Sequence, residues 1–393
     1  MEKQRFNQLD SLRGVAALSV LLHHYLYILP SIYGSGTTNS FGLNLIKYSP
    51  LHLLWAGTES VMFFFVLSGF VLALPFLNGT ALSYKNYIIK RICRIYIPYI
   101  IAVITAIVAA TLFSRWSDIP DLSVWFNSKW DEPLDLGSIL GHLTLIFSFN
   151  NGEYDPVLWS LVQEMRASLF FPIIMYFVMK YNWKITLGAA LFLSIVGYGG
   201  HFVTYHITSM NLKNDYFISL HYLLMFVVGS LLAKHRLELV GIFQRLNVAS
   251  RLIAVLIAIL SYTYAWWFLP HKDILHIQII NEWFNVIGVA LFLLFAISYN
   301  KFKTILELSP IHFFGKISYS LYLYHAIAML TFVNLWYGKM PLGWILLISF
   351  VVSLILATVS YYFVEKSSIK IGNKLTNKSK INKNTDIKKI IAS

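Results

Sequence analysis

The stretch LHLLWAGTESVMFFFVLSGFVLALPFL (residues 51–77) decides the fold class, because it contains about 20 nearly uncharged apolar residues in succession. An α-helix of that length crosses the hydrocarbon core of a bilayer, which is ~30 Å thick. The composition of the whole chain agrees. Of its 393 residues, 57% are hydrophobic and only 12% are charged, too few polar groups to cover a water-soluble globule of this size. We therefore expect an all-α integral membrane protein.

Similar apolar runs recur along the chain and predict a polytopic bundle of about ten transmembrane helices. The predicted spans are 11–29, 51–77, 95–113, 158–179, 185–206, 216–233, 252–269, 283–299, 318–337 and 342–364. Ten spans put both termini on one side. That side carries 24 of the 31 Lys and Arg residues, against six on the other side and Arg166 inside a span. By the positive-inside rule both termini are cytoplasmic, and the net charge of +13 reflects topology rather than nucleic-acid binding.

We expect residues 1–365 to form one membrane domain of a multi-pass cell-membrane protein, and residues 366–393 a basic cytoplasmic tail resting on anionic lipid. The outer loop 114–157 is the longest predicted connection. It carries Trp116, Trp125 and Trp130 together with a cluster of acidic residues. Loops longer than about 15 residues are usually functional or disordered. Its indole rings fit sugar binding and an interfacial aromatic belt equally well.

Ionisable side chains inside the spans are the candidates for chemistry, because a buried charge must be paired or is very costly. In the first span Arg13 and His24 lie eleven residues apart, about 16 Å along the helix and on nearly the same face. At the cytoplasmic end of the third span, Arg91 and Arg94 share a helix face. They form either a fork for phosphate groups or an interfacial anchor.

Three further acidic and histidine side chains lie within the predicted spans. Glu59 lies near the outer end of the second span, and Glu164 lies about one turn inside the outer end of the fourth. His325 lies about two turns above the cytoplasmic end of the ninth. A buried histidine can be catalytic or can simply hydrogen-bond a partner. No set of His, Cys and carboxylate residues falls at metal-ligand spacing, so we expect no metal.

Five stretches together resemble the motifs of the integral membrane acyltransferase 3 family. They are LDSLRGVAALSVLLHHY (9–25), FFFVLSGF (63–70), the Arg-x-x-Arg of residues 91–94, LWSLVQEMRASLFFP (158–172) and ISYSLYLYHA (317–326). They follow one another in family order over nearly the whole chain. Many members add an extracytoplasmic SGNH hydrolase-like domain, which we do not expect in this chain.

The resemblance implies an O-acyltransferase that moves an acyl group, most often acetyl, from cytoplasmic acyl-CoA to a hydroxyl of an extracytoplasmic or cell-surface glycan. The family's Arg-x10-His pattern matches Arg13 and His24, its Arg-x-x-Arg matches Arg91 and Arg94, and its buried glutamate after Trp-Ser matches Glu164. The expected partners are thus the lipid bilayer, acyl-CoA and a glycan or glycolipid acceptor.

Residue chemistry suggests a division of labour among these groups. The three arginines can hold the phosphates of CoA. His24 is either a general base on the acceptor hydroxyl or a carrier of the acyl group. Glu164 or Glu59 can orient that histidine or the acceptor, and His325 either stabilises the thioester oxyanion or lines the pantetheine channel.

The alternative function is a proton-coupled secondary transporter, because histidine, glutamate and arginine near mid-membrane would serve a solute pathway. Such a protein should show internal symmetry, and the two halves of the sequence contain no matching pair of broken helices. A lipid-binding scaffold would leave the buried charges without a purpose.

Overall fold

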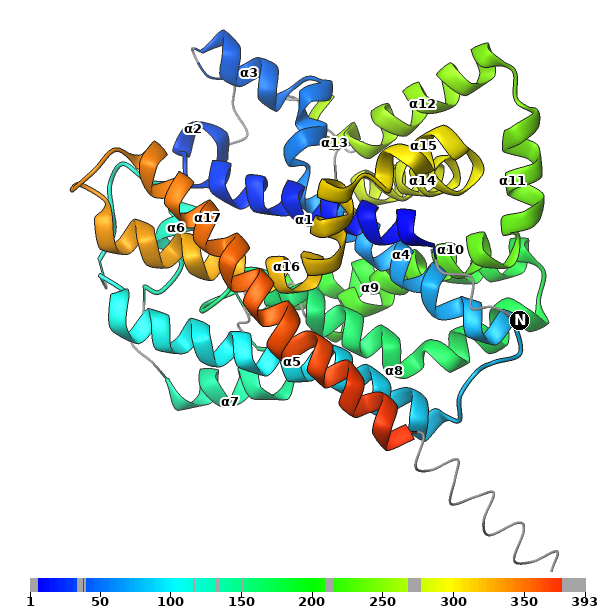
Figure 1. Cartoon of the computed structure of the whole chain (residues 1–393), viewed down its shortest axis with the longest axis horizontal. Coiled ribbons are helices and arrows are strands. Elements are labelled where there is room, and N and C mark those ends of the chain that lie inside the picture. Colours follow the sequence, from blue (N-terminus) through cyan, green and yellow to red (C-terminus); the bar gives the residue numbers. More distant parts are fainter. Residues whose placement is uncertain are drawn as a thin grey trace, which may run out of the picture.

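The structure, a computed structural model, describes residues 6–33, 38, 40–115, 117–131, 135–149, 152–208, 215–267 and 277–376. These residues form a helical bundle without a β-strand, which agrees with the predicted all-α membrane fold (Figure 1). Trp116 and residues 377–393 of the predicted tail lie outside the described residues.

The helices follow the predicted spans closely. Their bounds are α1 Asn7–Tyr27, α2 Pro30–Tyr33, α3 Phe41–Lys47, η1 Pro50–Trp55, α4 Gly57–Leu77, α5 Tyr84–Phe113, α6 Val124–Asn127, α7 Leu136–Thr144, α8 Leu158–Lys180, α9 Trp183–Thr208, α10 Tyr216–Lys234, α11 Arg236–Arg245, α12 Val248–Tyr262, α13 Tyr264–Trp267, α14 Gln278–Ser298, α15 Asn300–Leu306, α16 Ser309–Trp336 and α17 Leu342–Ser360. A π-helical turn, η3 (Tyr361–Glu365), then continues α17 into a helix that ends at Thr376. The predicted boundary at residue 365 therefore falls inside a helix.

Seven described helices are long and apolar enough to cross a membrane: α4, α5, α8, α9, α10, α14 and the helix that begins with α17. The other three predicted spans are also helical. Of these, α12 has only 15 residues, whereas α1 and α16 have 21 and 28 residues but are too polar to qualify. These two polar helices carry His24 and His325, so the candidate site itself lowers their hydropathy.

Helices α1 and α16 pack tightly because glycines meet at their crossing. A Cβ atom on Gly14 would lie 2.4 Å from the backbone nitrogen of Gly315, and one on Gly315 would lie 2.5 Å from the backbone oxygen of Asp10. Any side chain would force the two backbones apart. His24 and His325 each lie ten residues beyond these glycines, about 15 Å further along helices that run in parallel. The glycine contact therefore sets the two histidines at the same height.

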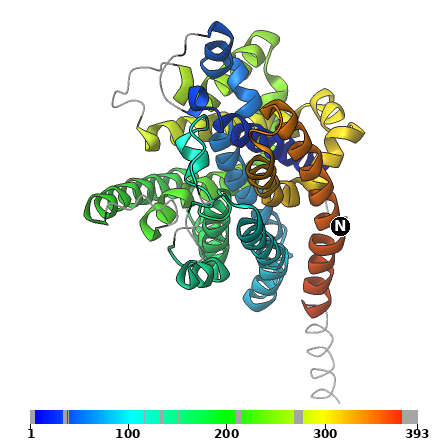
Figure 2. The ribbon, with the colours of Figure 1, turned by 90° about the vertical axis from the view of Figure 1, so that its left-hand side faces the viewer.

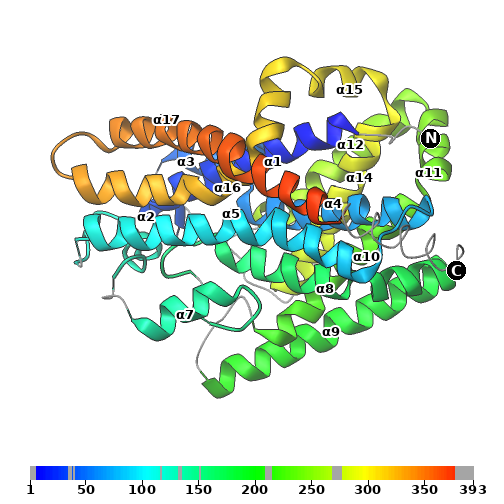
Figure 3. The ribbon, with the colours of Figure 1, turned by 60° about the horizontal axis from the view of Figure 1, so that its bottom comes forward.

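The remaining helices surround this pair. Helix α4 packs on α1 and α10, where Gly229 lies against the backbone of Val66. Figure 3 shows α16 between α17 and α5, in agreement with their contacts. Helix α9 and the helix that begins with α17 lie at the periphery (Figure 2), and only 22% of the apolar window of each is buried. Their exposed apolar faces suit contact with lipid.

The described parts of the predicted outer loop contain the short helices α6 and α7, and α7 packs against α5. The hydroxyls of Tyr96 and Tyr99 on α5 donate to the backbone oxygens of Leu143 (2.6 Å) and His142 (2.7 Å). The indole N–H of Trp130 donates to the oxygen of Tyr154 at 2.9 Å. These bonds fix the segment to the helices that it covers.

Candidate functional site

The structure brings His24 and His325 into direct contact, although 301 positions separate them. Nδ1 of His24 lies 2.8 Å from Nε2 of His325. The ring centroids are 5.1 Å apart and the ring planes differ by 11°, so the two imidazoles lie edge to edge in nearly one plane. This is the geometry of a straight N–H···N hydrogen bond. His325 is fully buried, whereas His24 is partly exposed.

The hydrogen bonds around His325 fix where the protons lie on both rings. Nδ1 of His325 lies 2.9 Å from the backbone oxygen of Leu321, and a carbonyl can only accept, so this nitrogen carries a proton. In neutral His325 the other nitrogen, Nε2, must then accept from Nδ1–H of His24. The lone pair of His24 is consequently on Nε2. The pair thus presents a basic nitrogen whose tautomer is set by its neighbours.

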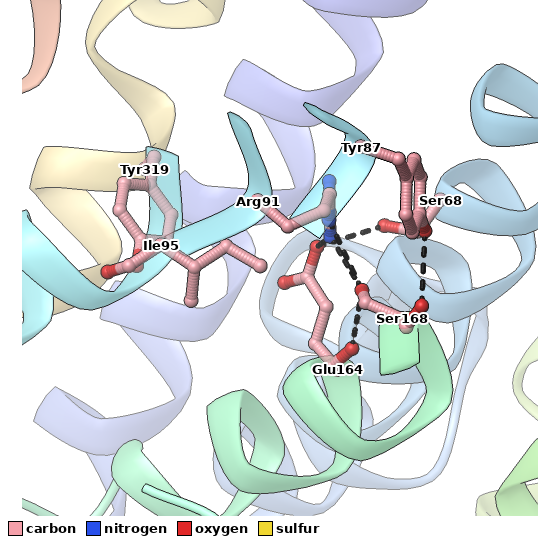
Figure 4. Close-up of polar contacts among 7 residues, drawn as sticks. All are labelled: Ser68, Tyr87, Arg91, Ile95, Glu164, Ser168 and Tyr319. Atoms are coloured by element: carbon pink, nitrogen blue, oxygen red, sulfur yellow. Dashed lines mark hydrogen bonds and ion pairs between the residues drawn. The ribbon is translucent and has the colours of Figure 1, made fainter. Parts of the chain in front are cut away.

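A second group of polar residues joins α5 to α8 (Figure 4). Nη2 of Arg91 lies 2.9 Å from Oε1 of Glu164, and Arg91 also donates to the hydroxyl of Ser168 through Nε and Nη2 at 3.1 and 2.8 Å. Glu164 and Ser168 are four residues apart, so they share one face of α8. Ser68 donates to the same carboxylate oxygen at 3.3 Å, and Tyr87 donates to the backbone oxygen of Ser168 at 3.1 Å. Glu164 therefore pairs with Arg91 and not with His24.

The two arginines of the Arg-x-x-Arg motif have different surroundings. Arg91 is 8% exposed and its charge is balanced by Glu164. Arg94 is exposed, and within the part of the chain that the structure describes its guanidinium makes no hydrogen bond or ion pair. Arg13 lies in electrostatic range of both and is paired with Asp10 at 3.2 Å. Of the three arginines, Arg94 is the one best placed to receive an anion.

Glu365 also belongs to this group, although it was not among the residues predicted from the sequence. It is 6% exposed, accepts a hydrogen bond from Ser320 at 3.0 Å and lies in electrostatic range of Arg94 and Arg13. It ends the π-helical turn, a feature that is often found at functional sites. The sequence feature that could have identified Glu365 is its position one residue beyond the last predicted span. Figure 4 also shows Tyr319, whose hydroxyl donates to Ile95 at 2.9 Å and so ties α16 to α5 beside Arg94.

Glu59 lies at the start of α4 in a separate polar contact. Its Oε1 accepts from the indole N–H of Trp266 at 3.0 Å and lies 3.7 Å from Nε2 of His52. The structure therefore places Glu59 with Trp266 and His52, whereas His24 lies against His325. Among the described residues no group of three or more His, Cys, Asp or Glu side chains could hold a metal ion.

The Trp-Ser motif at the start of α8 contacts α16 near His325. Ser160 and Tyr322 share a hydroxyl hydrogen bond of 2.6 Å. Just before α8 lies Asp155, a fully buried residue whose Oδ1 accepts from the backbone N–H of Val157 at 3.3 Å. Burial raises the pKa of the Asp155 carboxyl to about 8, so this group is protonated at neutral pH.

The Asp155→Asn variant should be more stable than the natural protein at neutral pH. The native carboxyl keeps its proton up to about pH 8, whereas the unfolded one loses it near 3.8. Its contribution to stability is therefore complete below about pH 4 and is lost as the pH rises to about 8, by about 1.4 kcal/mol per pH unit. Asparagine has no proton to lose. The melting temperatures of the two detergent-purified proteins should converge near pH 4 and diverge up to pH 8, and parallel curves would contradict this assignment.

The family model described as "Acyltransferase domain" matches residues 6–362. The proteins named O-acetyltransferase OatA from Staphylococcus aureus strains NCTC 8325 / PS 47, COL and MRSA252 are each 24% identical to this chain over 383 residues, which cover 93% of this chain and 57% of the relative. The chain thus spans little more than half the length of these relatives. No solved structure matches it.

Proposed function

The chain belongs to the acyltransferase 3 family of integral membrane proteins, and from this premise we propose that it is an O-acetyltransferase that moves an acetyl group from acetyl-CoA to a carbohydrate hydroxyl. The observation that carries the proposal is the hydrogen-bonded His24–His325 pair, which leaves the lone pair of His24 on Nε2. The close contact between Gly14 and Gly315 sets the two histidines level with each other along α1 and α16. The name of the relatives, O-acetyltransferase, supports acetyl as the transferred group and an oxygen atom as its acceptor.

In the proposed reaction His24 acts as the general base. Its Nε2 takes the proton of the acceptor hydroxyl while the oxygen attacks the thioester carbonyl carbon. The carbon–sulfur bond then breaks, and the proton passes from His24 to the departing thiolate, so that the products are the acetyl ester and CoA–SH. His325 is a positioning residue, since both of its nitrogens are engaged and neither can donate to an oxyanion.

In this proposal the donor, acetyl-CoA, lies between the His24–His325 pair and the end of the bundle that carries Arg13, Arg91 and Arg94, here called the arginine side. CoA carries a pyrophosphate and a 3′-phosphate, for which Arg94 is the exposed cation. About 16 Å of helix rise separates Arg13 from His24, and the pantetheine arm would bridge this distance. Arg91 and Glu164 form the wall of that path. By the distribution of lysine and arginine, the arginine side is cytoplasmic, and the chain lies in the cell membrane.

The test is release of free CoA thiol from acetyl-CoA by the detergent-purified full chain, with and without soluble cell-envelope glycan. We expect glycan to stimulate the release and the acetyl ester to appear on the glycan. If a folded protein releases no thiol from any acyl-CoA but takes up a solute in vesicles, it is a transporter.

The Arg94→Ala variant should raise the KM for acetyl-CoA about tenfold and leave kcat nearly unchanged, because it removes a charged contact to a CoA phosphate but nothing at the reacting atoms. Thiol-release kinetics measure both constants. The matched control is Lys85→Ala, which removes an exposed positive charge from the same helix. An equal rise in KM for the control would show that Arg94 attracts the donor only through the general positive potential.

A further inference from the structure

The described residues 114–115 and 117–131, here called the cap, are attached to the ends of the two helices that carry the histidines. Ser123 donates through its backbone N–H to Ile28 (2.9 Å) and through its hydroxyl to Tyr27 (2.5 Å), where α1 ends. Arg115 donates to the backbone oxygens of Asn334 (2.5 Å) and Tyr337 (2.7 Å), where α16 ends. These bonds satisfy carbonyl groups that a helix leaves unpaired at its C-terminus. The cap is thus fixed over the His24–His325 pair.

The cap places Trp125 directly on His24. The hydroxyl of Ser123 accepts from the backbone N–H of Phe126 at 3.2 Å and so starts the single turn of α6. On that turn the indole of Trp125 lies parallel to the His24 ring, with centroids 5.2 Å apart and planes that differ by 10°. Tyr27 meets the same indole edge-on at 6.0 Å. Trp125 and His24 are in contact, and both are partly exposed.

Two other tryptophans near this end, Trp55 and Trp130, have structural contacts instead. Trp55 and Trp130 are each 2% exposed, and their indole N–H groups donate to backbone oxygens. Trp125 differs, because its side chain is partly exposed and, among the described residues, its indole N–H has no acceptor. Its contact with His24 also distinguishes it from a belt residue, whose ring would face lipid headgroups.

We propose that Trp125 is the acceptor-binding residue of the site. The apolar C–H face of a sugar ring packs on the part of the indole that His24 does not cover, and the indole N–H donates to a sugar oxygen. This contact holds one ring hydroxyl at Nε2 of His24, where the proton transfer described above begins. The inference rests on the proposed function and adds the residue that selects a cyclic, hydroxylated acceptor.

The experiment separates the acceptor from the donor. Thiol release from acetyl-CoA by the detergent-purified full chain is measured without glycan, when water is the acceptor, and then with increasing soluble cell-envelope glycan. The variants are Trp125→Ala, Trp125→Phe and the matched control Val124→Ala, which changes an exposed neighbour on the same turn (76% exposed).

We expect Trp125→Ala to raise the half-saturating glycan concentration about tenfold, a larger change than in the glycan-free rate or in the KM for acetyl-CoA. Trp125→Phe keeps a ring and should lose less, and Val124→Ala should lose nothing. Unchanged half-saturation in Trp125→Ala would overturn the proposal. An equal fall in the glycan-free rate would overturn it too, because Trp125 would then only support His24.

Two outcomes with the natural protein distinguish this inference from its premise. Thiol release that glycan does not stimulate would overturn the carbohydrate site and leave the acyl-CoA chemistry standing. No thiol release under any condition would refute the proposed function and the inference together.

Discussion

Replacing His24 with alanine should lower kcat for acetyl transfer by about 10²- to 10⁴-fold, the range that a positioned general base contributes. The variant loses the Nε2 lone pair that the His325 hydrogen bond sets. Its KM for acetyl-CoA should change little, because the arginines that bind the donor are untouched. His24 is partly exposed and the glycine contact between α1 and α16 remains, so the protein should still fold. Steady-state thiol release, with melting temperature as the folding check, measures these effects.

Two further variants define the role of the histidine pair. His325→Ala should also lower kcat, but by less than His24→Ala, because Nε2 of His24 survives and only its tautomer and orientation are lost. His206→Ala, which removes an exposed histidine at the end of α9, is the matched control and should be as active as the natural protein. Full activity in His24→Ala would exclude this residue from the chemistry. An acetyl group trapped on His24 without acceptor would show that it carries the acyl group.

Breaking the Arg91–Glu164 pair should have the largest effect on stability. In Glu164→Leu the guanidinium of Arg91 stays buried without its carboxylate, and the free energy of unfolding should fall by about 3 kcal/mol. This value is at the lower end for a buried pair because the Glu164 side chain is 20% exposed. Arg91→Leu should lower the free energy of unfolding by a similar amount, because it leaves the Glu164 carboxylate without its guanidinium. The melting temperature and the yield of folded protein in detergent should both fall.

The double variant Arg91→Leu with Glu164→Leu tests whether pairing is the cause. With both charges gone, no unpaired ion remains in the bundle, and much of the lost stability should return. Activity should not return, because the polar wall of the proposed donor path is also gone. Strictly additive losses of stability would show that Arg91 and Glu164 act independently, contrary to their 2.9 Å contact.

The helical content of the bundle was predictable from the sequence. Within the described residues, each of the ten apolar windows overlaps a helix, because hydropathy over about 20 residues is a local property that needs no partner. The criterion of length and hydropathy alone recovers seven of them. It misses α1 and α16 because these helices carry the polar residues of the candidate site. Family membership was also predictable, since the five motifs are read directly from the chain and the family model matches residues 6–362.

The partners of the site residues were less predictable. His24, His325, Arg91 and Glu164 were identifiable as candidates from the sequence, and Glu164 was expected to orient His24 or the acceptor. The structure gives Glu164 to Arg91. Glu365 was not predicted from the sequence, because it comes just after the last apolar window, where a tail was expected to begin.

What the sequence determined by itself was therefore the class of protein, the position of the long apolar helices and the types of residue available for chemistry. Only the tertiary structure decided which of these residues meet. The contact between His24 and His325 depends on where Gly14 and Gly315 let two helices touch, and the contact between Trp125 and His24 depends on how the cap attaches to the helix ends. Helix formation follows from neighbours a few residues apart, whereas helix register follows from packing between residues some 300 positions apart, which no local pattern encodes.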